Sequence, residues 1–149
     1  MSGLESIKVK VEGLGGSAAF AHNALPVLHE IRHALAELAA GGEPTVIDLS
    51  AIPFGPGDRE QLFQVLGEGE IKATLSAMGE SLIRETAYPG VWLVTHLSPQ
   101  GEELATHIEV ARLPALLITP ELDVEDALAA LSARLQADDP LHPESETNT

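Results

Sequence analysis

Apolar side chains recur along the chain with two spacings, which divide it into strands and helices. Ile7, Val9 and Val11 alternate with charged residues, as is typical of a half-buried strand. Between residues 23 and 40, leucine and isoleucine recur every three or four positions, so one face of a helix is apolar. The same reasoning predicts strands over 45–49, 70–76, 81–87, 91–97 and 106–111, and helices over 58–66 and 123–135. The pattern does not indicate whether residues 115–119 form a helix, a strand or a loop.

The order and spacing of these segments predict the fold class. A strand, a helix and a second strand over residues 6–49 favour a crossover with parallel pairing, whereas the short connections after residue 70 favour antiparallel neighbours. We therefore predict an α+β fold, with a mixed sheet that ends in an antiparallel meander and packs against two or three helices. Residues 1–137 are expected to form one domain, and the acidic, proline-bearing residues 138–149 a disordered tail.

Composition narrows the classes of function. The chain has 149 residues, 44% of them hydrophobic, and a formal net charge of -15, which disfavours nucleic acid and anionic membranes as partners. It has no cysteine, so disulfides, thiolate metal sites and cysteine nucleophiles are excluded. No signal-peptide pattern opens the chain and no apolar run approaches the ~20 residues of a membrane span. These features predict a cytoplasmic protein.

The most unusual local sequence lies where the helix over 58–66 meets the following strand. There, Gly67, Glu68, Gly69 and Glu70 alternate glycine with carboxylate. A glycine past the last apolar residue can end a helix in the left-handed conformation, and a second glycine allows close backbone approach. The turn is therefore either a helix cap followed by solvated acid or an acidic recognition loop.

Histidines give a weaker candidate for chemistry. His29 and His33 are four residues apart on the polar face of the first helix, and His22 joins them if the helix extends back that far. Three imidazoles at this spacing can bind a metal, but no carboxylate-rich second helix face accompanies them. A solvated helix face or a partner surface explains the same residues, so no metal or other cofactor is predicted.

The remaining candidates lie in the predicted meander. Glu85, Gly90, Trp92 and Glu109 fall in or beside its strands, close in topology to the Gly-Glu-Gly-Glu turn. Carboxylates around an aromatic anchor suit a basic, partly extended peptide, although a lone tryptophan in an aromatic-poor chain also suits a core. The titratable residues form no convincing catalytic set, so we predict that the protein is not an enzyme. A hydrolase with a site hidden from the sequence stays an alternative.

Five blocks occur in an order that resembles the HupH/HyaF family of nickel–iron hydrogenase expression and formation proteins. The resemblance extends over roughly residues 20 to 120. The blocks are Asn23-Ala24-Leu25-Pro26 with Leu28-His29-Glu30-Ile31, Ile47-Asp48-Leu49, Leu66 to Ile71, Ile83-Arg84-Glu85-Thr86 with Pro89-Gly90-Val91-Trp92, and Ile108-Glu109-Val110 with Pro114.

This resemblance implies a chaperone-like maturation factor that binds the immature iron–sulfur small subunit of a [NiFe] hydrogenase in the cytoplasm, together with other maturation factors. It suggests partner binding for residues that match the family's blocks: Gly67, Glu68, Gly69, Glu70, Glu85, Gly90, Trp92 and Glu109. Longer members of the family contain two related halves, so a homodimer of this chain is a further prediction. The alternative is a metal-binding or metal-delivery accessory protein.

Overall fold

The computed structural model describes residues 23–137 and residue 141, and its contacts divide the chain into two compact units. The first unit is Met1–Pro114 and the second is Ala115–Thr149. Each is described by itself below. The strand predicted over residues 6–12, His22 and the tail apart from Leu141 lie outside the described residues. The expected single domain over residues 1–137 stays a prediction.

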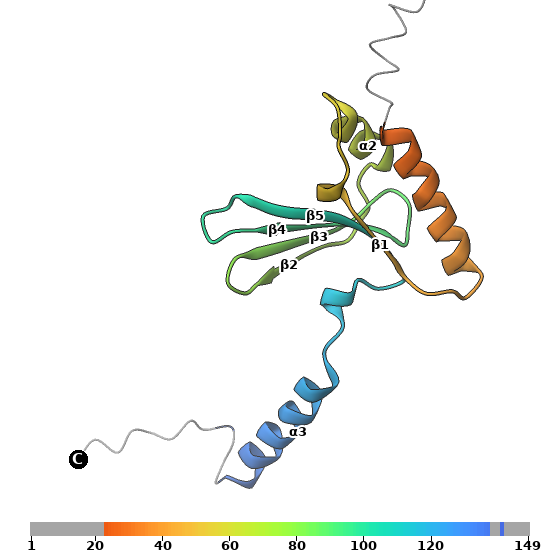
Figure 1. The fold of residues 1–149 in the computed structure, drawn as a ribbon. Coiled ribbons are helices and arrows are strands. Elements are labelled where there is room, and N and C mark those ends of the chain that lie inside the picture. The colour runs from red at the N-terminus through yellow and green to blue at the C-terminus, as the bar shows by residue number, and fades with distance from the viewer. Residues whose placement is uncertain (1–22, 138–140, 142–149) are drawn as a thin grey trace, which may run out of the picture. The chain divides into compact units, whose positions relative to one another are not determined.

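The first unit is built on a five-stranded antiparallel sheet (Figure 1). Its strands are β1 (Thr45–Asp48), β2 (Lys72–Ser76), β3 (Glu80–Glu85), β4 (Val91–Leu97) and β5 (Glu103–Val110). They lie in the order β1-β5-β4-β3-β2, so consecutive hairpins join β2 to β5 and β1 closes the far edge. The α+β class and the meander are confirmed. Every pairing among the described strands is antiparallel. The predicted parallel pair needs the strand over residues 6–12, which lies outside the described residues.

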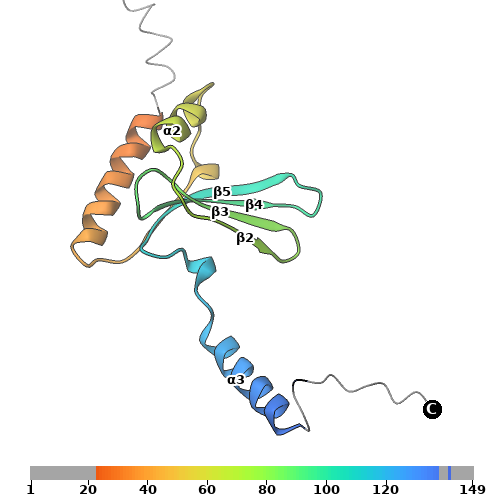
Figure 2. The same ribbon diagram turned by 180° about the vertical axis from the view of Figure 1, so that it is seen from behind.

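One face of the sheet packs against a helix over residues 23–39 and against α2 (Asp58–Leu66). Both helices lie towards the same end of the sheet in the two opposite views (Figures 1 and 2). Leucine, isoleucine, valine and alanine at helical spacing turn inward because their burial removes apolar surface from water. The main core contains Val27, Ile31 and Ala34 of the first helix, Leu62 and Leu66 of α2, and Ile47, Val91, Leu93, Ile108 and Val110 of the sheet.

Asp58 and Gln61 have the spacing of a capping box, but the start of α2 is built differently. Gly57 is the N-cap, with a φ of 82° that favours glycine, and no side chain caps the helix. The buried Asp58 carboxylate instead accepts a hydrogen bond from the backbone N–H of Gly55 at 2.8 Å. The carboxylate therefore fixes the Gly55–Gly57 turn rather than the first turn of the helix. A short 3-10 helix, η1 (Leu49–Ala51), precedes this turn.

An ion pair ties α2 to the sheet. The Arg59 guanidinium bonds to the Glu103 carboxylate and donates to the Thr106 hydroxyl at 3.0 Å, while Thr106 also donates to Glu103. Arg59 also lies over the Phe63 ring, with 5.3 Å between its guanidinium carbon and the ring centroid. The hydrogen bonds from Arg59 and Thr106 hold the pKa of the Glu103 carboxyl below its usual 4.5.

A carboxyl group whose pKa is lower in the folded state than in the unfolded state stabilises the fold at pH values above its unfolded-state pKa. This stabilisation is lost as the pH falls through its folded-state pKa. Glu103→Gln is therefore expected to lower the free energy of unfolding near neutral pH by up to about 1 kcal/mol, since the pair is partly exposed. The difference should disappear as the pH falls below 4.5. Urea titrations at neutral and acid pH measure it, with the exposed neighbour Glu102→Gln as the control. An equal deficit at both pH values would refute the electrostatic tether.

The second unit contains a 3-10 helix, η2 (Ala115–Leu117), and the helix α3 (Glu121–Gln136). Residues 115–117, which the sequence left unassigned, thus form a helical turn. The predicted final helix is present but begins before Asp123, because Pro120 takes the N-cap position and Asp123 lies in the first turn. None of the described helices combines the length and apolar character that a membrane crossing requires.

Candidate partner-binding site

The Gly-Glu-Gly-Glu turn joins the end of α2 to the sheet through backbone hydrogen bonds. The Gly67 N–H donates to the carbonyl of Phe63 at 2.9 Å and closes the helix, with Gly67 at φ 62° and ψ -162°. This backbone region is almost restricted to glycine. The Ala87 N–H donates to the Leu66 carbonyl at 2.8 Å, so the helix end is fastened to the segment that follows β3. The prediction that a glycine ends this helix is confirmed, but the ψ of Gly67 differs from the left-handed helical conformation that was expected.

Gly69 has a different role, because its place is set by space rather than by a left-handed φ. Its N–H donates to the Glu85 carbonyl at 2.8 Å, and the Glu85 N–H donates to the Ile71 carbonyl at 2.9 Å. A Cβ at residue 69 would lie 2.4 Å from the carbonyl oxygen of Thr86 and 2.9 Å from a Glu85 carboxylate oxygen. The turn can thus lie against β3 only if residue 69 has no side chain.

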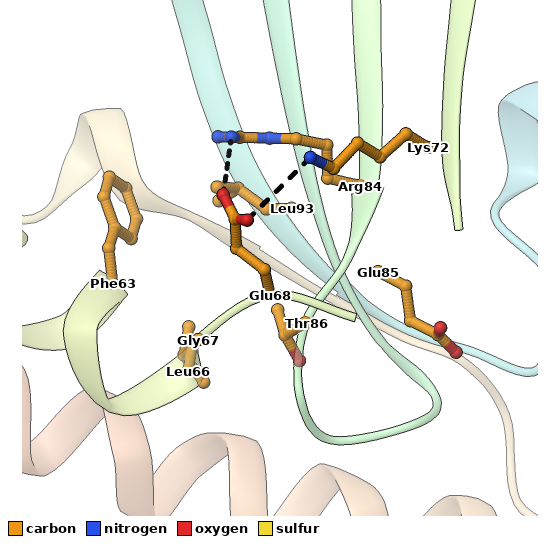
Figure 3. Close-up of a pocket in the computed structure, with 9 residues that line it drawn as sticks. All are labelled: Phe63, Leu66, Gly67, Glu68, Lys72, Arg84, Glu85, Thr86 and Leu93. Atoms are coloured by element: carbon orange, nitrogen blue, oxygen red, sulfur yellow. Dashed lines mark ion pairs between the residues drawn. The ribbon is translucent and has the colours of Figure 1, made fainter. Parts of the chain in front are cut away.

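Glu68 lies on the solvent side of this turn, between two basic side chains (Figure 3). Its carboxylate oxygens are 3.8 Å from Lys72 Nζ and 3.9 Å from an Arg84 guanidinium nitrogen, and its side chain is 70% exposed. These distances are long for charge-assisted hydrogen bonds, so the pairs are loose and solvated. Glu70 is also exposed, and no ion pair is recorded for it among the described residues.

A small cavity of about 90 Å³ lies beneath Glu68. Its floor is apolar and its rim carries the charges of Glu68, Lys72 and Arg84 (Figure 3). It is too small for a cofactor, whose pockets usually exceed about 300 Å³, but it is large enough for part of one side chain. Its lining residues are Phe63, Leu66, Gly67, Glu68, Lys72, Arg84, Glu85, Thr86 and Leu93.

Glu85, Trp92 and Glu109 form one row across β3, β4 and β5. The register places Glu85 opposite Trp92 and Trp92 opposite Glu109. The sheet therefore brings together three of the predicted residues, but the carboxylate of Glu85 points away from that of Glu68 (Figure 3). The acidic residues expected in one patch are thus divided between the turn and the row.

Burial separates this row into core and surface. Trp92 is 4% exposed, packs with Ile83 and Val94, and donates its indole N–H to the Ala111 carbonyl at 3.0 Å. Glu109 is also 4% exposed, with its carboxylate 3.8 Å from His107 Nε2. Side chains buried this far offer a partner almost no surface, so Trp92 is a core residue of the described structure. Glu85, which is half-buried, is the member of the row that solvent reaches most.

Gly90 shapes the connection that carries the chain into β4. Its φ is 90°, and its carbonyl accepts a hydrogen bond from the Ala111 N–H at 2.9 Å. The nearest side chains to a Cβ at this position belong to Leu35 and Leu38 of the first helix, at 3.7 and 3.9 Å. Gly90 thus permits a left-handed turn beneath that helix, and its contribution to any binding site is indirect.

The sequence did not single out Lys72 and Arg84, although both lie at the candidate site. They are directly opposite each other in the β2–β3 register. The short connection between β2 and β3 determines which residues of the two strands lie opposite each other. Once the ends of that connection are known, the pairing of Lys72 with Arg84 follows. His96 and His107 were also missed; their ring centroids are 5.6 Å apart, and Ser81 Oγ lies 2.8 Å from His96 Nδ1.

The histidines considered for metal binding are exposed on the first helix. His33 Nε2 lies 4.0 Å from a Glu37 carboxylate oxygen, and His29 has no recorded partner in the described part of the chain. No group of three or more candidate ligands is placed to hold a metal ion within residues 23–137. His22 lies outside the described residues.

Comparison with known proteins places this geometry in a family. The family model for the C-terminal conserved region of HupH hydrogenase expression protein matches residues 21–137. The chain is 33% identical over 114 residues to the hydrogenase expression/formation protein HoxQ of Azotobacter vinelandii, and 32% identical over 111 residues to HupQ of Azotobacter chroococcum mcd 1. Each match covers 73% of this chain and 39% of the relative, so the chain corresponds to well under half the length of these relatives.

A solved structure has the same fold. The hydrogenase expression protein HupH from Thiobacillus denitrificans ATCC 25259 matches with a TM-score of 0.72 and 49% identity, over 76% of this chain and 94% of that one. The family match contains the whole candidate site, from the end of α2 to β5. The chain therefore belongs to the family of hydrogenase expression proteins defined by the C-terminal conserved region of HupH.

Proposed function

We propose that this domain acts as a chaperone-like maturation factor that binds the immature iron–sulfur small subunit of a [NiFe] hydrogenase. The observation that carries the proposal is the family match over residues 21–137, because its members are hydrogenase expression and formation proteins. The proposal places this step in the cytoplasm, alongside other maturation factors.

The contact surface we propose is the outer side of the turn, with Glu68 and Glu70 as its exposed charges and Glu85 at its margin. Gly67 and Gly69 shape and fasten the turn, so the carboxylates project from a rigid base. The loose pairs of Glu68 with Lys72 and Arg84 can be exchanged for cations of a client. The cavity beneath Glu68 can take the end of one client side chain. A basic, partly extended client segment suits this arrangement.

A non-catalytic role fits the site better than hydrolysis. Glu103 has a lowered pKa, but its cause is the tether to Arg59 and Thr106, which joins α2 to the sheet. The carboxylates of Glu68 and Glu85 point apart, so they cannot share one reacting atom as an acid–base pair (Figure 3). The turn is thus proposed to bind rather than to catalyse.

Affinity purification from hydrogenase-expressing cells tests this proposal. The tagged protein is expected to recover the small-subunit precursor, and the double variant Glu68→Gln, Glu70→Gln is expected to recover at least tenfold less, as about 1.4 kcal/mol of lost binding energy implies. The matched control is Glu43→Gln, Glu60→Gln, which removes the same charge from exposed positions away from the turn. Its recovery should equal that of the parent protein.

Two results would count against the proposal. The first is a parent protein that recovers no small subunit under conditions where other maturation complexes are retained. That result would show that the small subunit is not its client. Equal losses in the two double variants would show that total charge, rather than the turn, governs capture.

A further inference from the structure

Strand β2 forms an outer edge of the sheet and pairs with β3 alone among the strands of the first unit. Both opposite views show it at the border of the sheet (Figures 1 and 2). An edge strand has one row of backbone N–H and C=O groups that its own sheet does not use. Such a row can pair with a strand from another chain.

The register identifies which residues point these groups outward. The Glu85 N–H bonds to the Ile71 carbonyl and the Ala77 N–H bonds to the Gly79 carbonyl, so odd-numbered residues bond towards β3. Residues that alternate with a hydrogen-bonded pair in an antiparallel ladder direct their N–H and C=O the other way. Lys72, Thr74 and Ser76 therefore present their backbone groups to the outer edge. No backbone hydrogen bond outside the sheet is recorded for them in the described part of the chain.

This edge has little of the protection that usually prevents pairing. Proteins block edges with proline, bulges or several charged side chains. β2 has the sequence Lys-Ala-Thr-Leu-Ser, with no proline, a regular register and a single charge at its first residue. Ala73 and Leu75 are two residues apart in the strand and so lie on the same face of the sheet. Ala73 packs against the apolar cluster of Ile83, Trp92 and Val94, but Leu75 is 39% exposed.

We propose that β2 pairs antiparallel with β2 of a second copy of this chain, with the two-fold axis at Thr74, so that the two sheets become one. This register places Thr74 opposite Thr74 of the partner subunit and Lys72 opposite Ser76 of the partner subunit. All three outward residues then form hydrogen-bonded pairs, which gives up to about six new backbone hydrogen bonds. The two-fold axis makes the contact self-complementary.

Side chains on both faces fit this register. On the helix-covered face, Arg84, Lys72, Ser76 of the partner subunit and Glu80 of the partner subunit form one row, because Lys72 is opposite Arg84 and Ser76 is opposite Glu80 in each sheet. The basic end of one hairpin thus meets the acidic end of the other, and the two Lys72 side chains are kept apart. Threonine pairs with threonine at the axis, which is a favourable cross-strand pair.

On the other face, the pairing sets Leu75 opposite Ala73 of the partner subunit, so the cluster of Ile83, Trp92 and Val94 continues across the interface. This covers part of the apolar surface that Leu75 exposes in one copy. The formal net charge of -15 on each copy opposes association at low salt, and for that reason the contact is best measured at physiological ionic strength. The inference does not rest on the proposed hydrogenase client.

Cysteine substitution tests the register, because the natural chain contains none. At the axis, the Cα atoms of the two residues at position 74 are about 5.5 Å apart, within the range of a disulfide. The two residues at position 76 are separated by about 13 Å along the strands, which a disulfide cannot span. Under mild oxidation, Thr74→Cys should yield a covalent dimer at least tenfold faster than Ser76→Cys. Equal rates for the two variants, or no cross-link from either, would overturn the proposal.

Sedimentation of the full chain from low to several hundred micromolar concentration provides the second test. The parent chain is expected to form dimers, and Thr74→Lys to remain monomeric, because it places two ammonium groups opposite each other at the axis. Val46→Lys adds the same charge to an exposed position on the opposite edge strand β1, and it should dimerise like the parent. A monomeric parent, or dimers lost through Val46→Lys and kept in Thr74→Lys, would contradict pairing through β2.

Discussion

Gly69→Ala is expected to lower the free energy of unfolding by about 2–3 kcal/mol, as overpacking against a fixed backbone does. The added methyl group would lie 2.4 Å from the carbonyl oxygen of Thr86, which cannot move without disturbing the end of β3. Moving residue 69 away would instead break its hydrogen bond to the Glu85 carbonyl. Urea denaturation followed by circular dichroism gives the value.

Gly101→Ala separates this steric effect from the general cost of replacing glycine. Gly101 has a φ of 84°, but nothing lies within 4 Å of the position of a Cβ. Its replacement should cost only about 1 kcal/mol, from backbone strain alone. If Gly69→Ala were no more destabilising than Gly101→Ala, the close contact between the turn and β3 would be absent in solution.

Trp92→Ala is expected to lower the free energy of unfolding by about 3–5 kcal/mol. The indole is buried against Ile83 and Val94, and its N–H is the hydrogen-bond partner of the Ala111 carbonyl. Removing it leaves a cavity and deprives a backbone oxygen of that bond. Because Trp92 is the only tryptophan, unfolding must be followed by circular dichroism instead of tryptophan fluorescence.

Tyr88→Ala is the matched control, since it removes the other large ring near the same connection. The Tyr88 side chain is 48% exposed, so its loss should change the stability by no more than about 0.5 kcal/mol. If Trp92→Ala kept the parent stability and lost only client capture, Trp92 would be a binding anchor and our assignment to the core would be wrong.

Sequence periodicity predicted the elements whose apolar pattern is regular. The strand over 91–97 and the helix over 58–66 have the bounds of β4 and α2. β4 is buried or half-buried along its whole length, and α2 buries apolar residues at helical spacing up to its last residue, Leu66. The start of β5 was missed by three residues. Glu103 pairs with Arg59 and Leu104 is exposed, while a bulge at His96/Leu97 shifts the register, so no simple alternation marks these residues.

The candidate site was predictable in position but not in the roles of its residues. Two glycines around a helix end indicated a tight turn, which is confirmed at Gly67. Gly69 is needed because the Thr86 carbonyl lies against it. This is a tertiary contact, and the sequence around Gly69 does not indicate it. The burial of Trp92 and Glu109 likewise follows from the strand order, which a single sequence does not specify. Partner binding by the acidic turn stays a prediction.

The central claim is that the glycines of the turn serve folding and its carboxylates serve binding. The direct test is the affinity of the purified domain for small-subunit precursor, measured by calorimetry for the parent, for Glu68→Gln, Glu70→Gln and for Glu43→Gln, Glu60→Gln. We predict at least tenfold weaker binding for the first double variant, unchanged binding for the second, and parent-like unfolding for both. Parent-like affinity in Glu68→Gln, Glu70→Gln would contradict the claim.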